Sequence, residues 1–182
     1  MIPDRIVRYL QSRLVPFARR WHTRAVSAQD LAESLHVSGF RVAKTVAVEV
    51  DGRLWIATIP APARLDLDLV REALGANEVR LAKESEFAGR FPDCEVGAEP
   101  PFGQLYGLPV LVDQSLDQED PLLMRAGSHE ETVELSFDNL RALEKPIVAP
   151  ISRVPEMPSL DRREETRIRS GVPVSITDRH AP

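Results

Sequence analysis

The strongest constraint on the fold is the stretch FRVAKTVAVEVDGRLWIATIPA, residues 40–61. Apolar and polar residues alternate on both sides of the dipeptide Asp51-Gly52, which is typical of a two-residue hairpin turn. The pattern therefore predicts a central β-hairpin. Because 182 residues, 43% of them apolar, can bury one sizeable core, we expect one domain around it.

The rest of the chain mixes helical and extended patterns. An amphipathic helix is predicted over residues 3–14, with Val7, Leu10 and Leu14 on its buried side. A capping pair, Ser27 and Asp30, predicts a second helix that runs to about residue 36. Further helices are predicted at 68–74, at 84–91 and from 138, and strands at 78–81, 109–112, 122–125 and 132–136. These elements predict a mixed α+β fold.

The composition changes near residue 149. Four prolines interrupt a polar stretch that includes DRREETRIR and lacks the apolar content for a core of its own. We therefore divide the chain into a domain over residues 1–148 and a proline-rich, charged tail over 149–182.

Neither a membrane segment nor a cysteine-based site is expected. No apolar run approaches the ~18 residues that a membrane span requires, and the first 14 residues are amphipathic, so a cytoplasmic protein without a membrane partner is predicted. Cys94 is the single cysteine, which excludes an intramolecular disulfide and a cysteine-rich zinc site. It is interpreted as structural, with a catalytic thiol as the alternative.

Charge is distributed unevenly. The protein has a net charge of −5, yet the first 24 residues contain six arginines and one acidic residue, Asp4, which gives that segment +5. On the predicted first helix Arg5, Arg8 and Arg13 lie opposite the apolar side. This face either is simply solvated or binds the phosphates of a nucleic acid.

Three places could carry chemistry, each with a structural alternative. Lys44, on a predicted strand, could hold an anion or a developing oxyanion, or point into solvent. The loop GAEPPFG, residues 97–103, could present backbone amides to a ligand or be a plain turn. His129, after Gly127 and Ser128, could act as a base or hydrogen-bond donor or lie on the surface.

Together these motifs resemble the YbaK/prolyl-tRNA-synthetase-associated family of trans-editing aminoacyl-tRNA deacylases. The lysine strand VAKTVAV, the GAEPPFG loop and the corner GSHEETVEL occur in the order typical of that family, over about residues 1–145. The resemblance implies a single domain in which helices flank a central, mixed, barrel-like β-sheet. It also implies that the loop walls a small pocket for the aminoacyl group at the 3′ end of a tRNA.

Site residues follow from this resemblance. It implies that Lys44 and His129 are catalytic, the lysine by binding and polarising the ester region and the histidine at the border of the amino-acid pocket. It implies tRNA contacts from Arg5, Arg8 and Arg13. The implied substrate-binding residues are Thr45, Gly97, Pro100, Pro101, Phe102, Gly103, Gly127 and Ser128. Thr45 departs from the asparagine usual in the alanyl-specific branch, so the resemblance leaves the amino acid open.

The implied reaction is hydrolysis of an activated ester on a mischarged tRNA with a small amino acid such as Ala, Cys, Ser or Thr. It needs a positioned water and a stabilised oxyanion more than a strong nucleophile. Neither a GxSxG nor an HExxH motif occurs, so we expect no metal and no cofactor. The expected partners are aminoacyl-tRNA and, as a further candidate, an aminoacyl-tRNA synthetase, but not DNA. A non-catalytic module that binds aminoacyl-tRNA or a synthetase is the alternative.

Overall fold

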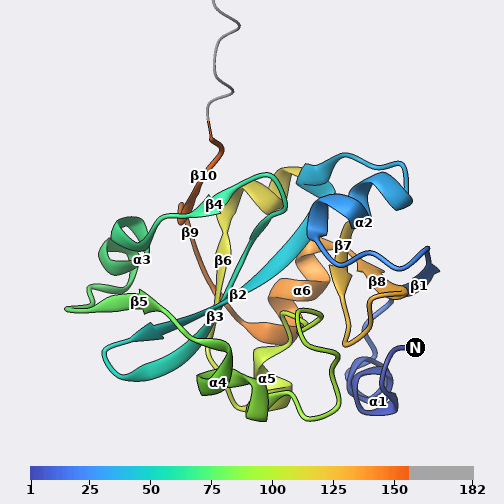
Figure 1. Ribbon diagram of the computed structural model, residues 1–182, viewed down its shortest axis with the longest axis horizontal. Helices are drawn as coiled ribbons and strands as arrows, with labels where there is room; N and C mark the ends of the chain where they lie inside the picture. The colour runs from blue at the N-terminus through green and yellow to red at the C-terminus, as the bar shows by residue number, and fades with distance from the viewer. Residues whose placement is uncertain (156–182) are drawn as a thin grey trace, which may run out of the picture.

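The predicted hairpin is the centre of the structure, a computed structural model that describes residues 1–155 (Figure 1). Strands β2 (Val42–Val50) and β3 (Arg53–Pro60) pair antiparallel, from Ala43 opposite Pro60 to Val50 opposite Arg53. Asp51 and Gly52 have φ angles of 47° and 78°, the positive values that a two-residue hairpin turn requires. The prediction of a hairpin at this place is confirmed.

An eight-stranded mixed sheet is built around the hairpin. Its order is β1-β8-β7-β2-β3-β6-β9, with β5 also paired to β2. Strand β2 is parallel to β7, and β3 and β9 are parallel to β6, whereas the other pairs in this sheet are antiparallel. The strands added to the hairpin are β1 (Ala18–Trp21), β5 (Val79–Leu81), β6 (Val110–Asp113), β7 (Leu122–Arg125), β8 (Glu131–Leu135) and β9 (Ile147–Ala149).

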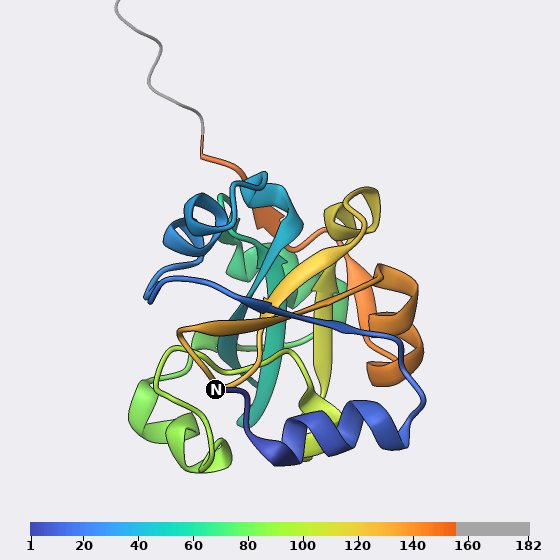
Figure 2. The ribbon, with the colours of Figure 1, turned by 90° about the vertical axis from the view of Figure 1, so that its right-hand side faces the viewer.

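The sheet curls into a half-barrel with helices around it (Figures 1 and 2). This confirms the predicted α+β fold with a barrel-like mixed sheet. The helices are α1 (Asp4–Ser12), α2 (Ala28–Ser34), α3 (Leu67–Leu74), α4 (Glu84–Phe87), α5 (Gly103–Tyr106) and α6 (Phe137–Glu144). Ser27 and Asp30 form the predicted capping box of α2.

Alternation along the strands divides the buried side chains between the two faces of the sheet. On β3, Ile56 packs with residues of α1, α5 and α6, whereas its neighbour Ala57 packs with Val70 of α3. A third cluster lies under α2 and includes Leu31 and Val42. The start of β2 thus lies where different clusters meet.

Three features differ from the sequence prediction. Strand β1 was not predicted, because its four residues, ARRW, are all exposed and show no alternation. Leu14 is 88% exposed, because α1 ends at Ser12 and Leu14 takes a left-handed conformation with φ 55°. The short helix α5 begins at the last residue of the GAEPPFG loop.

The described fold also continues beyond the predicted domain boundary at residue 148. Strand β9 ends at Ala149, and β10 (Ser152–Arg153) pairs with β4 (Arg64–Leu65). Between them, Ile151 is fully buried and its N–H donates to the carboxylate of Asp113 over 3.0 Å. Residues to Arg153 therefore belong to the folded unit, and the rest of the predicted tail from residue 156 lies outside the described residues.

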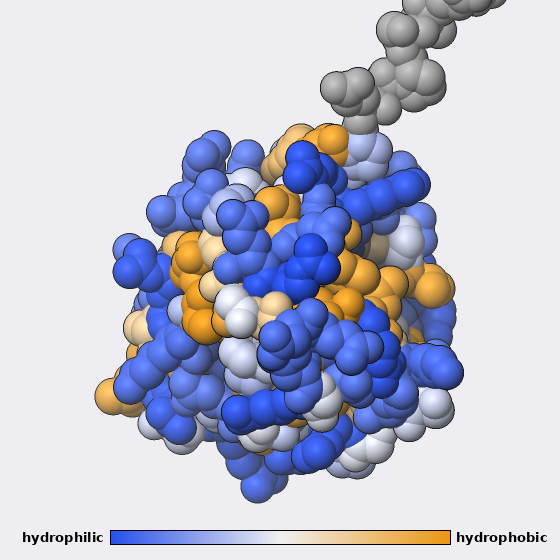
Figure 3. Space-filling model, turned by 90° about the vertical axis from the view of Figure 1, so that its left-hand side faces the viewer, coloured by the Kyte–Doolittle hydropathy of each residue, from blue (hydrophilic) through white to orange (hydrophobic). Residues whose placement is uncertain are grey.

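The face that carries α3 and β5 is mostly hydrophilic, with apolar side chains gathered in groups across its middle (Figure 3). Within residues 1–155, no helix is long and apolar enough to cross a membrane.

Candidate active site

A break in strand pairing positions the candidate site. On the edge away from β3, β2 is covered by β7 only at Val42 and Ala43, and by β5 only from Val48 onward. Among the described residues, positions 44–46 therefore have no strand partner on that edge. A cavity of about 180 Å³ opens beside this uncovered stretch.

We call this cavity the lysine cavity. Its polar lining consists of Lys44 and Thr45 from β2, Glu99 from the GAEPPFG loop and Arg125 from the end of β7. Gly97 and small apolar side chains at the starts of α2 and β2 complete the wall. A cavity of this volume has room for several waters or a small acyl group.

Lys44 is fixed within this wall. Its Nζ donates to the carbonyl oxygens of Ala61 and Ala63 over 2.8 and 2.7 Å, just beyond the end of β3. Burial lowers the pKa of Lys44, and the nearby charge of Arg64 lowers it further. Since an ammonium has three N–H donors, one remains for a ligand after these two contacts.

The GAEPPFG loop divides into two parts. Gly97, with φ 81°, and Glu99 line the lysine cavity, and the Gly97 N–H donates to Oε1 of Glu99 over 3.0 Å. Pro100, Pro101 and Phe102 are buried and lie outside the lining of this cavity. The Phe102 ring packs in the main core, 6.2 Å from the ring of Tyr9.

Gly103 also belongs to the core side of the loop. A Cβ atom at this position would lie 2.4 Å from the carbonyl oxygen of Leu108 and 2.4 Å from Cγ2 of Val110. The glycine is therefore required by close packing where α5 begins, and the structure does not place it at the lysine cavity.

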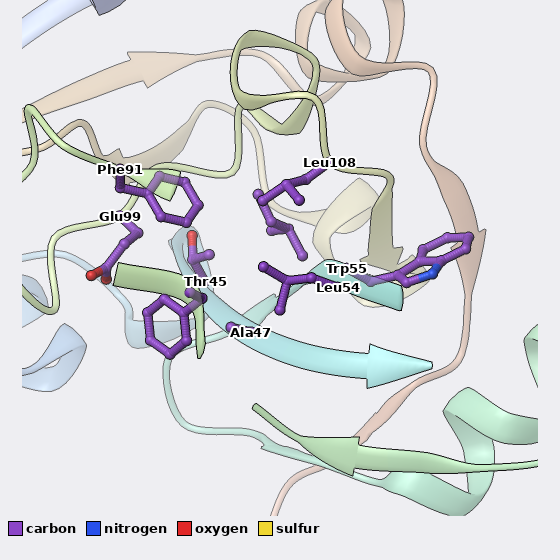
Figure 4. A pocket seen from close by; sticks show the side chains of 9 residues that line it. Thr45, Ala47, Leu54, Trp55, Phe91, Glu99 and Leu108 are labelled. Carbon is purple, nitrogen blue, oxygen red and sulfur yellow. The ribbon is translucent and has the colours of Figure 1, made fainter. Parts of the chain in front are cut away.

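A second, smaller pocket of about 20 Å³ shares Thr45 and Glu99 with the lysine cavity (Figure 4). We call it the apolar pocket. In Figure 4 the Glu99 carboxylate and Thr45 lie at the end away from Trp55. The remaining lining is almost entirely apolar and comes from Ala47, Leu54, Trp55, Ile56, Phe87, Phe91 and Leu108.

The Gly127-Ser128-His129 corner lies behind the lysine cavity and is buried. Gly127, with φ 84°, packs so closely that a Cβ atom there would lie 2.8 Å from Cδ of Pro3. The Ser128 hydroxyl accepts hydrogen bonds from the backbone N of Met1 and of Glu130, over 3.0 and 3.2 Å. Gly127 thus allows close packing against Pro3, and Ser128 forms hydrogen bonds within the protein.

Both ring nitrogens of His129 have hydrogen-bond partners within the protein. Nε2 donates to the carbonyl oxygen of Val96 over 2.8 Å, and Nδ1 contacts the guanidinium of Arg125 and the carbonyl oxygen of Ala25. Its ring therefore connects the loop before Gly97 to Arg125. The structure brings His129 next to a wall of the lysine cavity without making it part of the lining.

The comparison with known families decides what kind of domain holds this cavity. Residues 22–143 match the model of the aminoacyl-tRNA editing domain, a span that contains Lys44, the GAEPPFG loop and His129. The chain belongs to the aminoacyl-tRNA editing domain family. The resemblance stated from the sequence motifs is therefore confirmed.

Solved structures agree with this editing-domain fold. The hypothetical protein APE2540 has a TM-score of 0.75 at 22% sequence identity, over 82% of this chain and 99% of that chain. A protein described as a candidate trans-editing enzyme for prolyl tRNA synthetase has a TM-score of 0.72 at 18% identity, over 82% of this chain and 96% of that chain.

Of the predicted tRNA-binding arginines, Arg5 and Arg8 lie on α1 and Arg13 follows its last residue, all outside the span matched by the family model. Arg5 donates to the carbonyl oxygen of Leu105 over 3.0 Å and lies 4.9 Å from the centre of the Tyr106 ring. Arg8 pairs with Asp4 over 3.6 Å, and Arg13 lies over the ring of Tyr9. Among the ion-paired arginines of residues 1–155, Arg8 is the most exposed, with 79% of its side chain accessible.

Cys94 has the properties of a structural residue in this editing domain. It is half-buried, its Sγ lies 3.5 Å from the hydroxyl of Tyr106, and burial raises its pKa to about 11. Such a thiol is a poor nucleophile near neutral pH. In residues 1–155, no three His, Cys, Asp or Glu side chains come together as a metal site, and the metal-free mechanism stays a prediction.

Sequence reasoning missed two charged residues of the lysine cavity, Glu99 and Arg125, besides its small apolar lining. Glu99 stands within the quoted loop, but only the folded loop shows that it is the loop side chain that reaches the cavity. Arg125 ends a predicted strand, and its position depends on the pairing of β7 with β2. A partly buried carboxylate such as that of Glu99, or a buried guanidinium such as that of Arg125, leaves no local signal in a single sequence.

Proposed function

We propose that this editing domain hydrolyses the ester bond between a small amino acid and the 3′ end of a mischarged tRNA. The observation that carries the proposal is the position of Lys44, whose ammonium is fixed by two carbonyl oxygens in the wall of a cavity of about 180 Å³. Family membership supports deacylation as the general reaction.

In the proposed reaction, the ester carbonyl of the substrate lies beside Nζ of Lys44. A water molecule adds to the carbonyl carbon, and the remaining N–H of the ammonium donates to the oxygen that becomes negatively charged. The tetrahedral intermediate then expels the ribose oxygen, which takes up the proton lost by the water. A donor that is already in place requires little reorganisation as the charge develops.

The apolar pocket supports a small amino acid as substrate. Its volume of about 20 Å³ accommodates a group the size of one water or a methyl group. Exclusion by size is also the effective way to reject a larger amino acid, because one methylene gives only about 1–3 kcal/mol by attraction. We propose that Thr45, at the junction of both cavities, contacts the side chain or ester of the substrate.

The other predicted site residues take different roles in this proposal. Gly97 lets the loop pass close to the substrate, whereas Pro100, Pro101, Phe102 and Gly103 fix the loop to the core. Gly127, Ser128 and His129 hold the loop and Arg125 in place. Arg5, Arg8 and Arg13 contact the tRNA backbone, and a synthetase is proposed as a second partner because one structural neighbour is described in relation to prolyl tRNA synthetase.

The test is single-turnover hydrolysis of tRNAs mischarged with Ala, Cys, Ser or Thr. We expect ester loss from at least one of them and competition by uncharged tRNA. Tight binding without ester loss would favour the non-catalytic binding module instead. Hydrolysis that uncharged tRNA does not inhibit would indicate a general esterase.

A further inference from the structure

The charges around the lysine cavity suggest how the substrate is oriented. Two cationic side chains, Lys44 and Arg125, and one carboxylate, Glu99, line it. The guanidinium of Arg125 is fixed to the protein, since it donates to the carbonyl oxygen of Ser27 over 2.8 Å and contacts the ring of His129. Glu99 is the carboxylate in the described lining, so it is the group that can bind a cation there.

Glu99 has one oxygen engaged and one available. Oε1 accepts the N–H of Gly97 over 3.0 Å, which fixes the carboxylate against its own loop. Within the part of the chain that the structure describes, Oε2 has no hydrogen-bond partner, and no basic side chain lies within ion-pair distance of the carboxylate. The side chain lines the apolar pocket (Figure 4) and also the lysine cavity.

An aminoacyl ester has a matching arrangement of charge. Its α-ammonium is attached to the carbon next to the carbonyl carbon, and its side chain leaves the same α-carbon. A cation that enters a partly enclosed cavity needs an anionic partner, because its desolvation is otherwise costly. Glu99 supplies that partner at the junction where the apolar pocket can take the side chain.

We propose that Glu99 binds the α-ammonium of the aminoacyl group and makes the domain selective for esters with a free amino group. With the ammonium on Glu99 and the side chain in the apolar pocket, the carbonyl is directed to Lys44. An N-acylated aminoacyl-tRNA lacks this charge, so it is held less well. The inference rests on the proposed deacylase function.

The experiment compares alanyl-tRNA with N-acetylalanyl-tRNA, prepared from the same tRNA, in single-turnover hydrolysis. We expect the wild-type protein to prefer the free amine, and Glu99→Gln to slow its hydrolysis by about ten- to hundredfold, the range for hydrogen bonds to charged groups. The rate on the N-acetyl ester should change little. Glu72→Gln is the control, because Glu72 lies on α3 and outside both cavity linings.

Two results would overturn the inference. If Glu99→Gln slowed hydrolysis of both esters equally, Glu99 would act on the attacking water and not on the ammonium. If the wild-type protein hydrolysed both esters at the same rate, the domain would not be selective for a free amino group. If the wild-type protein hydrolyses neither alanyl ester nor the tRNAs mischarged with Cys, Ser or Thr, the proposed function fails separately. Binding of a non-hydrolysable 3′-alanylamide tRNA and its N-acetyl form then tests Glu99 directly, since Glu99→Gln should weaken only the first.

Discussion

At the start of β2, Lys44 and Thr45 line a cavity, and Lys44 keeps one N–H donor after its two carbonyl contacts, whereas at the β7–β8 corner Ser128 and His129 bond to other groups of the protein. Both regions carry residues that look catalytic in the sequence. The difference between them is pairing. A polar atom can bind a ligand where the fold leaves it a hydrogen-bond donor or acceptor without a partner. It stabilises the fold where its hydrogen bonds are made within the protein.

The largest expected effect tests the Lys44 side of this comparison. Lys44→Ala removes a donor fixed beside the ester, so deacylation should slow at least about a hundredfold, as for other preorganised oxyanion donors. Lys44→Arg should restore little, because a planar guanidinium cannot make the same two carbonyl contacts. The measurement is single-turnover hydrolysis of the preferred mischarged tRNA, with thermal melting to check folding.

Lys83→Ala is the control, since Lys83 lies before α4 and outside both cavity linings. Near-normal rates of deacylation in Lys44→Ala would show that Lys44, like Ser128 and His129, has a structural role.

The same lysine predicts a pH dependence. Because burial lowers its pKa, the ammonium loses its proton at a lower pH than the ordinary lysine value of 10.5. The catalysed rate, divided by the rate of hydroxide hydrolysis of the free ester, should therefore fall as the pH rises, with a midpoint below 10.5. A ratio independent of pH up to that value would contradict a role for the charged form.

Gly103→Val tests the core half of the loop. The new side chain would meet the Leu108 carbonyl oxygen and Val110, so it should destabilise the fold by about 1–3 kcal/mol or more, as overpacked cores do. The free energy of unfolding by urea measures this. Gly89→Val is the matched control, because a Cβ at Gly89 meets nothing within 4 Å. A stable, inactive Gly103→Val protein would instead place Gly103 at the ligand.

His129→Ala tests the corner. It leaves the Val96 carbonyl oxygen without its His129 donor and removes one contact of the buried Arg125 guanidinium, which should cost about 1–3 kcal/mol of stability. Rates measured on the folded protein should fall less than in Lys44→Ala. If stability were unchanged while the rate fell as far as in Lys44→Ala, His129 would be catalytic and the contrast between the two regions would be wrong.

The smallest effect is expected on α1. Replacing Arg5, Arg8 and Arg13 with Gln should weaken tRNA binding modestly and reduce its salt dependence, because each lost phosphate contact removes up to about one unit of the slope. Arg5 and Arg13 also pack on aromatic rings, so their contribution is shared with the fold. Arg71→Gln on α3 is the control. An unchanged slope would mean that this face is only solvated.

The sequence predicted the features that depend only on residues close together in the chain. The turn at Asp51 and Gly52 and the capping box at Ser27 follow from residues that are neighbours in the chain. The site depends on distant pairings. The gap beside Lys44 exists because neither β7 nor β5 covers the stretch of β2 between them. In the GAEPPFG loop, Phe102 packs in the core whereas Glu99 lines the cavity, and this depends on contacts with residues distant in the chain. No single sequence displays these relations.

Strand β2 contacts β3, β5 and β7, so it is the most highly connected strand of the sheet. Strands of this kind open only when a domain unfolds as a whole. The backbone amide protons of β2 that are hydrogen-bonded to β3 should therefore exchange with deuterium at a rate set by global unfolding. The ammonium of Lys44 is therefore carried by a strand that its pairing with β3 keeps closed until the domain unfolds, even though the other edge is uncovered at positions 44–46.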